Sequence, residues 1–186
     1  ISFTKGKALL TVYVKDRSSN KFGGIIGINS DDKTGKLILS GDVDLKLNNG
    51  LRVGDKFILN WRKTRQNTQN FLVYSAFPYL FKSRFGVNGE LTNLRRDTTF
   101  SNTSSKLGVS YQIQNNQYIS VFVKNNKSNS LFQSFANQIP DFNSTQTVYY
   151  GMEFGFNTLD YAVNPRKGYS FIGTVSSGTK TITKTD

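Results

Sequence analysis

The chain has 186 residues, enough for one domain with a sizeable core, and a formal net charge of +12. It contains no cysteine and no histidine, which excludes a disulfide scaffold, thiolate or histidine metal sites and a Ser-His-Asp triad. An aromatic content of 13%, frequent glycine and rare proline favour strands and turns over helices. No stretch approaches the roughly eighteen consecutive apolar residues of a transmembrane helix, although membrane-barrel strands give much weaker hydropathy signals.

About ten strands and no helix are predicted along the chain. They lie at residues 8–15, 22–28, 36–47, 55–65, 70–77, 84–94, 105–114, 118–124, 147–157 and 168–176. Residues 125–145 form the longest irregular stretch, and the alternating tail from 178 to 186 has the pattern of a further strand.

Strict alternation is clearest at residues 36–47, where apolar residues at odd positions alternate with mostly polar ones such as Asp42 and Asp44. A period of two places one set on each face of a strand. About ten such residues suit a tilted strand that crosses a bilayer. The pattern therefore predicts one apolar face and one wet, charged face.

The links between the strands fall into two alternating sets, near 48–54, 78–83, 114–117 and 158–167, and near 29–35, 65–69, 95–104 and 125–145. Successive hairpins place the two sets at opposite ends of a sheet. Short turns at one end and longer loops at the other are typical of outer-membrane barrels. We therefore predict an all-β, antiparallel up-and-down meander of this type.

The basic charge is spread through the chain, often on the polar side of strands, and is not gathered in one run. Nucleic-acid binding is the usual reading of such a charge. A basic barrel lumen or a surface near anionic lipid explains it equally well. We expect no nucleic-acid partner.

Several short segments, in order, resemble the outer-membrane-protein assembly-factor family (BamA-like, bacterial surface antigen), in particular its Bacteroidetes-type members. They are NKFGGIIG at 20–27, TGKL at 34–37, GDV at 41–43, LNNG at 47–50 with GD at 54–55, FPYL at 77–80, RDTTF at 96–100, TLD at 158–160 and NPRKGY at 164–169. Family members have a sixteen-stranded barrel, so the resemblance covers about its first half. The family's Arg-bearing lumen-loop motif and its closing strands are not among the matches.

The resemblance implies a domain division, a location and a function. Residues 1–19 would end the last periplasmic POTRA domain and link it to the barrel, and residues 20–186 would form the N-terminal half of a transmembrane barrel in the bacterial outer membrane. Such a barrel folds and inserts other outer-membrane proteins through a lateral seam. Its partners would be outer-membrane lipid, unfolded client proteins and accessory lipoproteins. No catalytic residue, metal or cofactor is implied.

Two groups of residues carry this expectation. The lateral-seam strand would consist of Phe22, Gly23, Gly24, Ile25, Ile26, Gly27 and Ile28, a weak edge with which a client strand can pair. A turn before a mid-barrel strand would use Asp160, Asn164, Pro165 and Gly168. The alternative for the three glycines of the strand is that they permit a β-bulge or tight curvature.

Other candidate sites have simpler explanations. Asp42 and Asp44 have the spacing of paired carboxylates, but lumen acids paired with Lys or Arg are the favoured interpretation. The aromatic side chains Trp61, Tyr79, Tyr149, Tyr150 and Tyr169 are candidates for the girdles at the membrane interfaces, or else for ordinary core positions.

Two other classes of protein stay open. One is a related barrel that exports a polypeptide through its pore. The other is a soluble, basic β-sandwich that binds a partner, for which both strand faces would be explained by a single closed core.

Overall fold

The computed structural model describes residues 2–4, 7–9, 13, 19–30, 35, 37–65, 68–96, 100–114, 116–130, 144–161 and 164–183. A small sheet pairs β1 (Ser2–Thr4) with β2 (Lys7–Leu9). A large sheet contains β3 (Lys21–Ser30), β4 (Leu37–Asn48), β5 (Lys56–Arg65), β6 (Thr68–Phe77), β7 (Phe85–Arg96), β8 (Phe100–Gln114), β9 (Gln117–Ser130), β10 (Ser144–Asn157) and β11 (Ser170–Thr183). The one helical element of the described residues is the short 3-10 turn η1 (Leu80–Lys82), and none of them forms a helix long and apolar enough to span a membrane.

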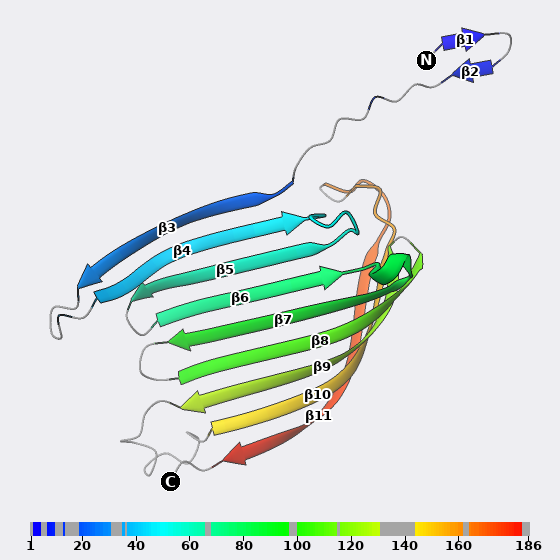
Figure 1. Cartoon of the computed structure of the whole chain (residues 1–186). Helices are drawn as coiled ribbons and strands as arrows, with labels where there is room; N and C mark the ends of the chain where they lie inside the picture. The colour runs from blue at the N-terminus through cyan, green and yellow to red at the C-terminus, as the bar shows by residue number, and fades with distance from the viewer. Residues whose placement is uncertain are drawn as a thin grey trace.

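The nine strands of the large sheet lie side by side in chain order, and every neighbouring pair is antiparallel (Figure 1). β3 and β11 form its two edges. The predicted all-β, up-and-down meander is therefore confirmed. Within the described residues the sheet is open, because no ladder joins β11 to β3.

Several strands extend further than the alternation predicted. β9 continues to Ser130, β8 begins at Phe100, and the tail to Thr183 continues β11 rather than starting another strand. The added residues are mostly Ser, Thr and Asn, so they show no apolar period, yet pairs such as Ser128 with Thr145 continue the backbone ladder.

The first predicted strand, at 8–15, is wrong in its limits, because β2 ends at Leu9 and Tyr13 lies outside any strand. The other residues of that prediction lie outside the described ones. Arg95 and Arg96, predicted in a link, are the last residues of β7.

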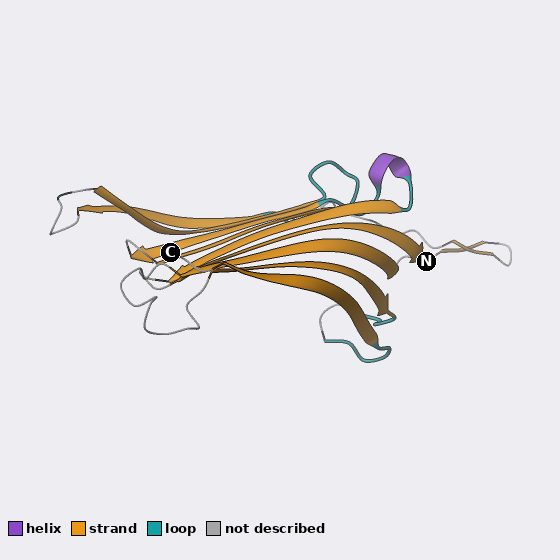
Figure 2. Cartoon of the chain, turned by 90° about the horizontal axis from the view of Figure 1, so that it is seen from below, coloured by secondary structure: helices purple, strands orange, loops and turns teal. Residues whose placement is uncertain are grey.

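The sheet is curved (Figure 2), and its two faces differ in polarity. We call the side that carries Leu59 and Val121 the apolar face and the side that carries Asn60 and Ser120 the polar face. Burial is inverted relative to a water-soluble sheet, since Val121 is 49% exposed while Ser120 is 4% exposed. Within the described residues, no second layer covers the apolar side chains.

The polar face is the concave one. The amine of Lys106 on β8 reaches the carboxylate of Glu153 on β10, across the intervening β9, with an N–O distance of 3.2 Å. Such a contact needs side chains that converge, as they do inside a curved sheet. The apolar face is therefore convex.

Candidate functional site

Edge strand β3 contains all seven residues of the predicted seam. Phe22, Ile26 and Ile28 lie on the apolar face, whereas Ile25 lies on the polar face opposite Asp42 of β4. All four of these side chains are at least 63% exposed. β3 has one ladder neighbour among the described strands, so its other edge presents backbone N–H and C=O groups that are free to pair.

The glycines of β3 are not explained by a bulge. Lys21–Ser30 pairs one for one with β4 without a register shift. A Cβ atom at Gly23 would meet nothing within 4 Å, and one at Gly27 would meet the Ser40 hydroxyl at 3.4 Å. The described chain therefore leaves room for side chains at both positions.

Beside β3, the polar face carries two acid–base pairs. The guanidinium Nε of Arg62 donates to Asp42 at 2.7 Å, and the amine of Lys21 lies 3.2 Å from Asp44. The side-chain amide of Asn60 donates to Asp44 at 2.7 Å. Each carboxylate therefore has its own cation, which confirms the interpretation of Asp42 and Asp44 as acids paired with Lys or Arg. No group of three or more potential metal ligands occurs in the described part of the chain.

The apolar residues form a band that runs diagonally across the strands. In one ladder row, Leu59 of β5 is connected strand by strand to Thr179 of β11. The band is centred on Leu59 in β5 but on Gly173 in β11, between Phe171 and Val175. Thr179 and Gly173 are six residues apart and the strands are six steps apart, so the band shifts by one residue per strand.

This shift corresponds to a definite strand tilt. With about 3.3 Å per residue along a strand and about 4.8 Å between strands, one residue per strand gives a tilt of about 35°. Strands in outer-membrane barrels tilt by about 35–45°. A band at one height on such a barrel crosses the strands with this offset.

Aromatic side chains mark the edge of the band at the end of the sheet with the short turns. The rings of Phe85 and Tyr111 have centroids 5.1 Å apart, and those of Phe156 and Tyr169 stack at 5.5 Å. Each pair lies three to four residues from the band centre of its strand, which matches the position of an interfacial girdle.

The predicted girdle residues divide between the two faces. Trp61 and Tyr150 lie on the apolar face. Tyr149 lies on the polar face, where it pairs with Lys124 and Gly178, so it is not a girdle residue. Neighbouring residues in a strand face opposite sides, and Tyr149 and Tyr150 therefore cannot share a role.

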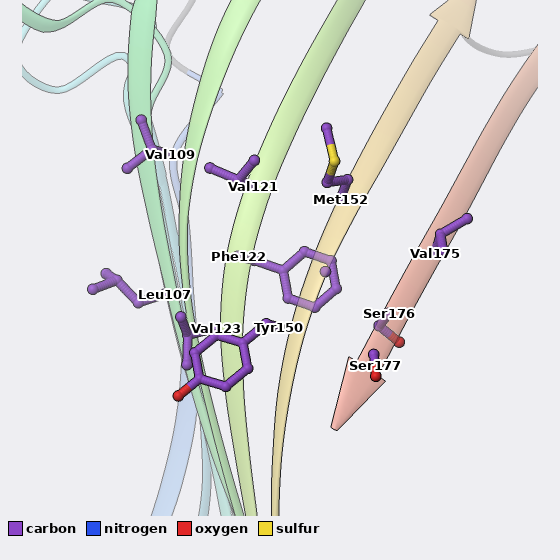
Figure 3. A pocket seen from close by; sticks show the side chains of 11 residues that line it. Leu107, Val109, Val121, Phe122, Val123, Tyr150, Met152, Val175, Ser176 and Ser177 are labelled. Atoms are coloured by element: carbon purple, nitrogen blue, oxygen red, sulfur yellow. The ribbon is translucent and has the colours of Figure 1, made fainter. Parts of the chain in front are cut away.

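An open apolar pocket of about 650 Å³ lies mainly on the apolar face of β8–β11 (Figure 3). Its large apolar-face side chains come from several strands: Leu107, Val109, Val121, Val123, Tyr150, Met152 and Val175. The lining is mostly apolar, and its hydroxyl-bearing residues are Tyr150, Ser176 and Ser177.

The most crowded part of the polar face surrounds Glu153. The hydroxyl of Tyr118 donates to this carboxylate at 2.8 Å, and the Lys106 amine lies 4.2 Å from the centroid of the Phe122 ring. The ring of Phe122 also covers Gly151 on the neighbouring strand, as the ring of Tyr118 covers Gly155. This cluster therefore connects β8, β9 and β10 through side-chain contacts.

The predicted turn motif folds into a closed turn between β10 and β11. The Asp160 carboxylate accepts backbone hydrogen bonds from Tyr161, Arg166 and Lys167 at 3.0–3.2 Å. Asn164 and Gly168 have positive φ angles of 59° and 96°. A Cβ atom at position 168 would collide with the backbone of the preceding strand end, which explains the glycine.

The pKa of the Asp160 carboxyl lies below its usual value. Desolvation raises the pKa, but the backbone hydrogen bonds from Lys167, Arg166 and Tyr161 together outweigh that effect. The folded turn therefore stabilises the ionised form of Asp160.

No protein-family model matches the chain, and no curated protein sequence matches it significantly. The functional interpretation therefore rests on the faces, the edge strand and the turn. Sequence reasoning missed the cluster around Glu153 and the aromatic cover of Gly151 and Gly155. The sequence gives little sign of them, because the contacting residues lie about 30 to 47 positions apart.

Proposed function

We propose that residues 20–186 form the first half of the wall of a transmembrane β-barrel in the bacterial outer membrane. The barrel acts as an assembly factor that folds and inserts other outer-membrane proteins. In this proposal residues 1–19 link the barrel to a periplasmic POTRA domain. The chain performs no catalytic chemistry and acts by pairing strands.

Two features together carry the proposal. One is the exposed apolar band, which runs at about 35° to the line perpendicular to the strands within the sheet. The other is the open, glycine-containing edge of the sheet at β3. Apolar side chains such as Leu107, 63% exposed, are stable when they face lipid, and this is their environment in the proposed barrel. A soluble sandwich would need a second layer over the same face.

The edge of β3 supplies a means of action. An unpaired backbone group costs several kcal/mol in hydrocarbon, so a client strand gains free energy when it pairs with β3. The pairing is β-augmentation, in which main-chain hydrogen bonds give affinity without a demand for one sequence. Open space at Gly23, and a single side-chain neighbour at Gly27, permit a client of varied side chains to lie close.

Photo-crosslinking in the full-length parent protein tests this function. A crosslinking amino acid is placed at Phe22 or Ile26 of β3, at Asn60 or Lys124 of the polar face, and at Val73 of the apolar face as a lipid-facing control. Assembly activity predicts client crosslinks at β3. Client crosslinks confined to Asn60 and Lys124 would favour the exporting barrel, whose substrate passes along the concave face. Recovery of the parent protein in a soluble fraction would contradict a membrane barrel of either kind.

A further inference from the structure

The described charges on the apolar face all lie near one end of the sheet. Among the side chains that the structure describes on that face of β3–β11, three are charged: Lys63, Arg95 and Lys127. All three are cations, and they lie on every second strand, β5, β7 and β9. No described acidic side chain shares their face.

The distance of these cations from the middle of the apolar band, measured along the barrel axis, follows from the tilt of the strands. The band centre is Leu59 on β5, Gly89 on β7 and Val121 on β9, according to the shift of one residue per strand. Lys63 lies four residues beyond its centre, and Arg95 and Lys127 lie six residues beyond theirs. On strands tilted by about 35°, these offsets are about 11–16 Å. The apolar band of an outer-membrane barrel extends about 12 Å on each side of its centre.

The three cations therefore reach the level of the lipid head groups at the end of the sheet with the long links. Lys63 and Arg95 are in the same ladder row, separated by Gln69, and Ser101 and Asn129 continue that row. Adjacent cations are about 10–12 Å apart. Together with these amide and hydroxyl groups, they form a row of donors suited to phosphate oxygens.

The opposite edge of the band differs in chemistry. It carries the aromatic pairs Phe85–Tyr111 and Phe156–Tyr169, and no charged side chain of the described residues lies on the apolar face there. Three cations on the polar face, Lys21, Arg62 and Lys106, differ because each has an acidic partner there. A cation without an acid on its own face, at the edge of a lipid-facing band, attracts an anion from outside the protein.

We propose that Lys63, Arg95 and Lys127 bind the phosphate groups of lipid in the leaflet nearest the long links. The apolar pocket on β8–β11 lies on the hydrocarbon side of Lys127, where it can receive an acyl chain of the same lipid. The occupant is thus a lipid with an anionic phosphate head group. This inference rests on the proposed barrel, since a soluble protein would present the same cations to water.

Lipid binding to the purified full-length protein tests the inference. The probes are nanodiscs of zwitterionic phosphatidylcholine with and without lipid A, and native mass spectrometry counts the lipid A molecules that stay bound. The test variant combines Lys63→Gln, Arg95→Gln and Lys127→Gln. A matched control with the same loss of charge combines Lys46→Gln, Lys124→Gln and Lys180→Gln on the polar face.

We expect lipid A affinity to fall about five-fold for each charge removed in the test variant and to stay unchanged in the control. Equal binding by the test variant and the original protein would overturn the inference, and so would an equal loss in the control. Binding of inorganic phosphate as tight as that of lipid A would also overturn it, because the site would then recognise a free anion.

Membrane residence and client crosslinking are measured for the same variants in cells. If the original protein is soluble, the proposed function fails together with this inference. If the test variant resides in the membrane and crosslinks clients at β3 but retains lipid A fully, this inference alone fails.

Discussion

Gly23 of β3 and the glycines of β10 lie in opposite environments of one sheet, and Gly24 of β3 is intermediate, since a Cβ atom there would lie 3.3 Å from the Asp42 backbone oxygen. Around Gly23 of β3 there is open space to 4 Å, whereas Gly151 and Gly155 of β10 lie beneath the rings of Phe122 and Tyr118. At Gly151 and Gly155 of β10, the missing side chain leaves room for an aromatic ring to pack on the concave face. At Gly23 of β3, no described atom lies close enough to exclude a side chain.

In the proposed function, the glycines of β10 serve packing and Gly23 of β3 serves strand pairing. The β8–β10 region is fixed by an ion pair, a hydrogen bond and two ring–glycine contacts around Glu153. The β3 edge has one neighbour and exposed side chains on both faces. Strands that exchange partners are drawn from the less stable parts of a fold. In the proposed function, β3 is therefore the strand that exchanges partners.

The largest expected effect comes from filling the space at Gly155. Gly155→Val forces the ring of Tyr118 away and disrupts its hydrogen bond to Glu153, and overpacking of this kind costs about 1–3 kcal/mol. Urea unfolding of the protein in detergent, followed by heat-modified mobility on gels, measures the loss. Gly23→Val is the matched control and should change the unfolding midpoint little. Similar destabilisation by both variants would remove the contrast between the two regions.

A second prediction compares two ion pairs on the polar face. The Lys106 and Glu153 side chains are 27% and 20% exposed, whereas those of Arg62 and Asp42 are 65% and 51% exposed. Glu153→Ala leaves a partly buried amine without its partner and should cost about 1–3 kcal/mol. Asp42→Ala should cost about 0–1 kcal/mol, because solvent screens an exposed pair. The same unfolding measurement decides, and a larger loss for Asp42→Ala would be evidence against a rigid β8–β10 region.

A third prediction concerns client pairing at the edge. Gly23→Val and Gly27→Val together place branched side chains beside the open edge of β3, where they hinder the approach of another strand. We expect client crosslinks at Phe22 to fall several-fold while the unfolding midpoint and the amount of protein in the membrane are unchanged. Undiminished crosslinking would show that these glycines have no part in strand pairing.

The smallest effect is expected at the turn between β10 and β11. Because the folded-state pKa of Asp160 is lowered, its hydrogen bonds stabilise the turn above the unfolded-state pKa, and this contribution is lost as the pH falls through the folded-state value. The protection factors of the Tyr161, Arg166 and Lys167 amides, which compare the measured exchange rate with the intrinsic rate at the same pH, should therefore fall at acidic pH. Asp160→Asn should remove most of this fall, and protection factors that do not change with pH in the original protein would contradict the role of Asp160.

Much of the fold could be predicted from local pattern. Alternation such as that from Leu37 to Leu47 depends on neighbouring residues alone, and the Asp160 turn depends on one short segment. The ends of β8, β9 and β11 could not be predicted, because their Ser, Thr and Asn residues have no apolar period. Nor could the contacts of Glu153, since they depend on the register of three strands and on the curvature of the sheet.

In the proposed barrel, the apolar face contacts lipid along a band that shifts by one residue per strand. Spin labels are introduced singly at Leu59 and at Gly173 of the reconstituted full-length protein. The depth of each label in the membrane is measured from its relative accessibility to oxygen and to a polar nickel chelate. Both labels should lie near the membrane centre. A label at Thr179, in the ladder row of Leu59, should lie about 16 Å nearer the surface. Equal depths for Leu59 and Thr179, or free access of the polar quencher to Leu59 and Gly173, would contradict the account.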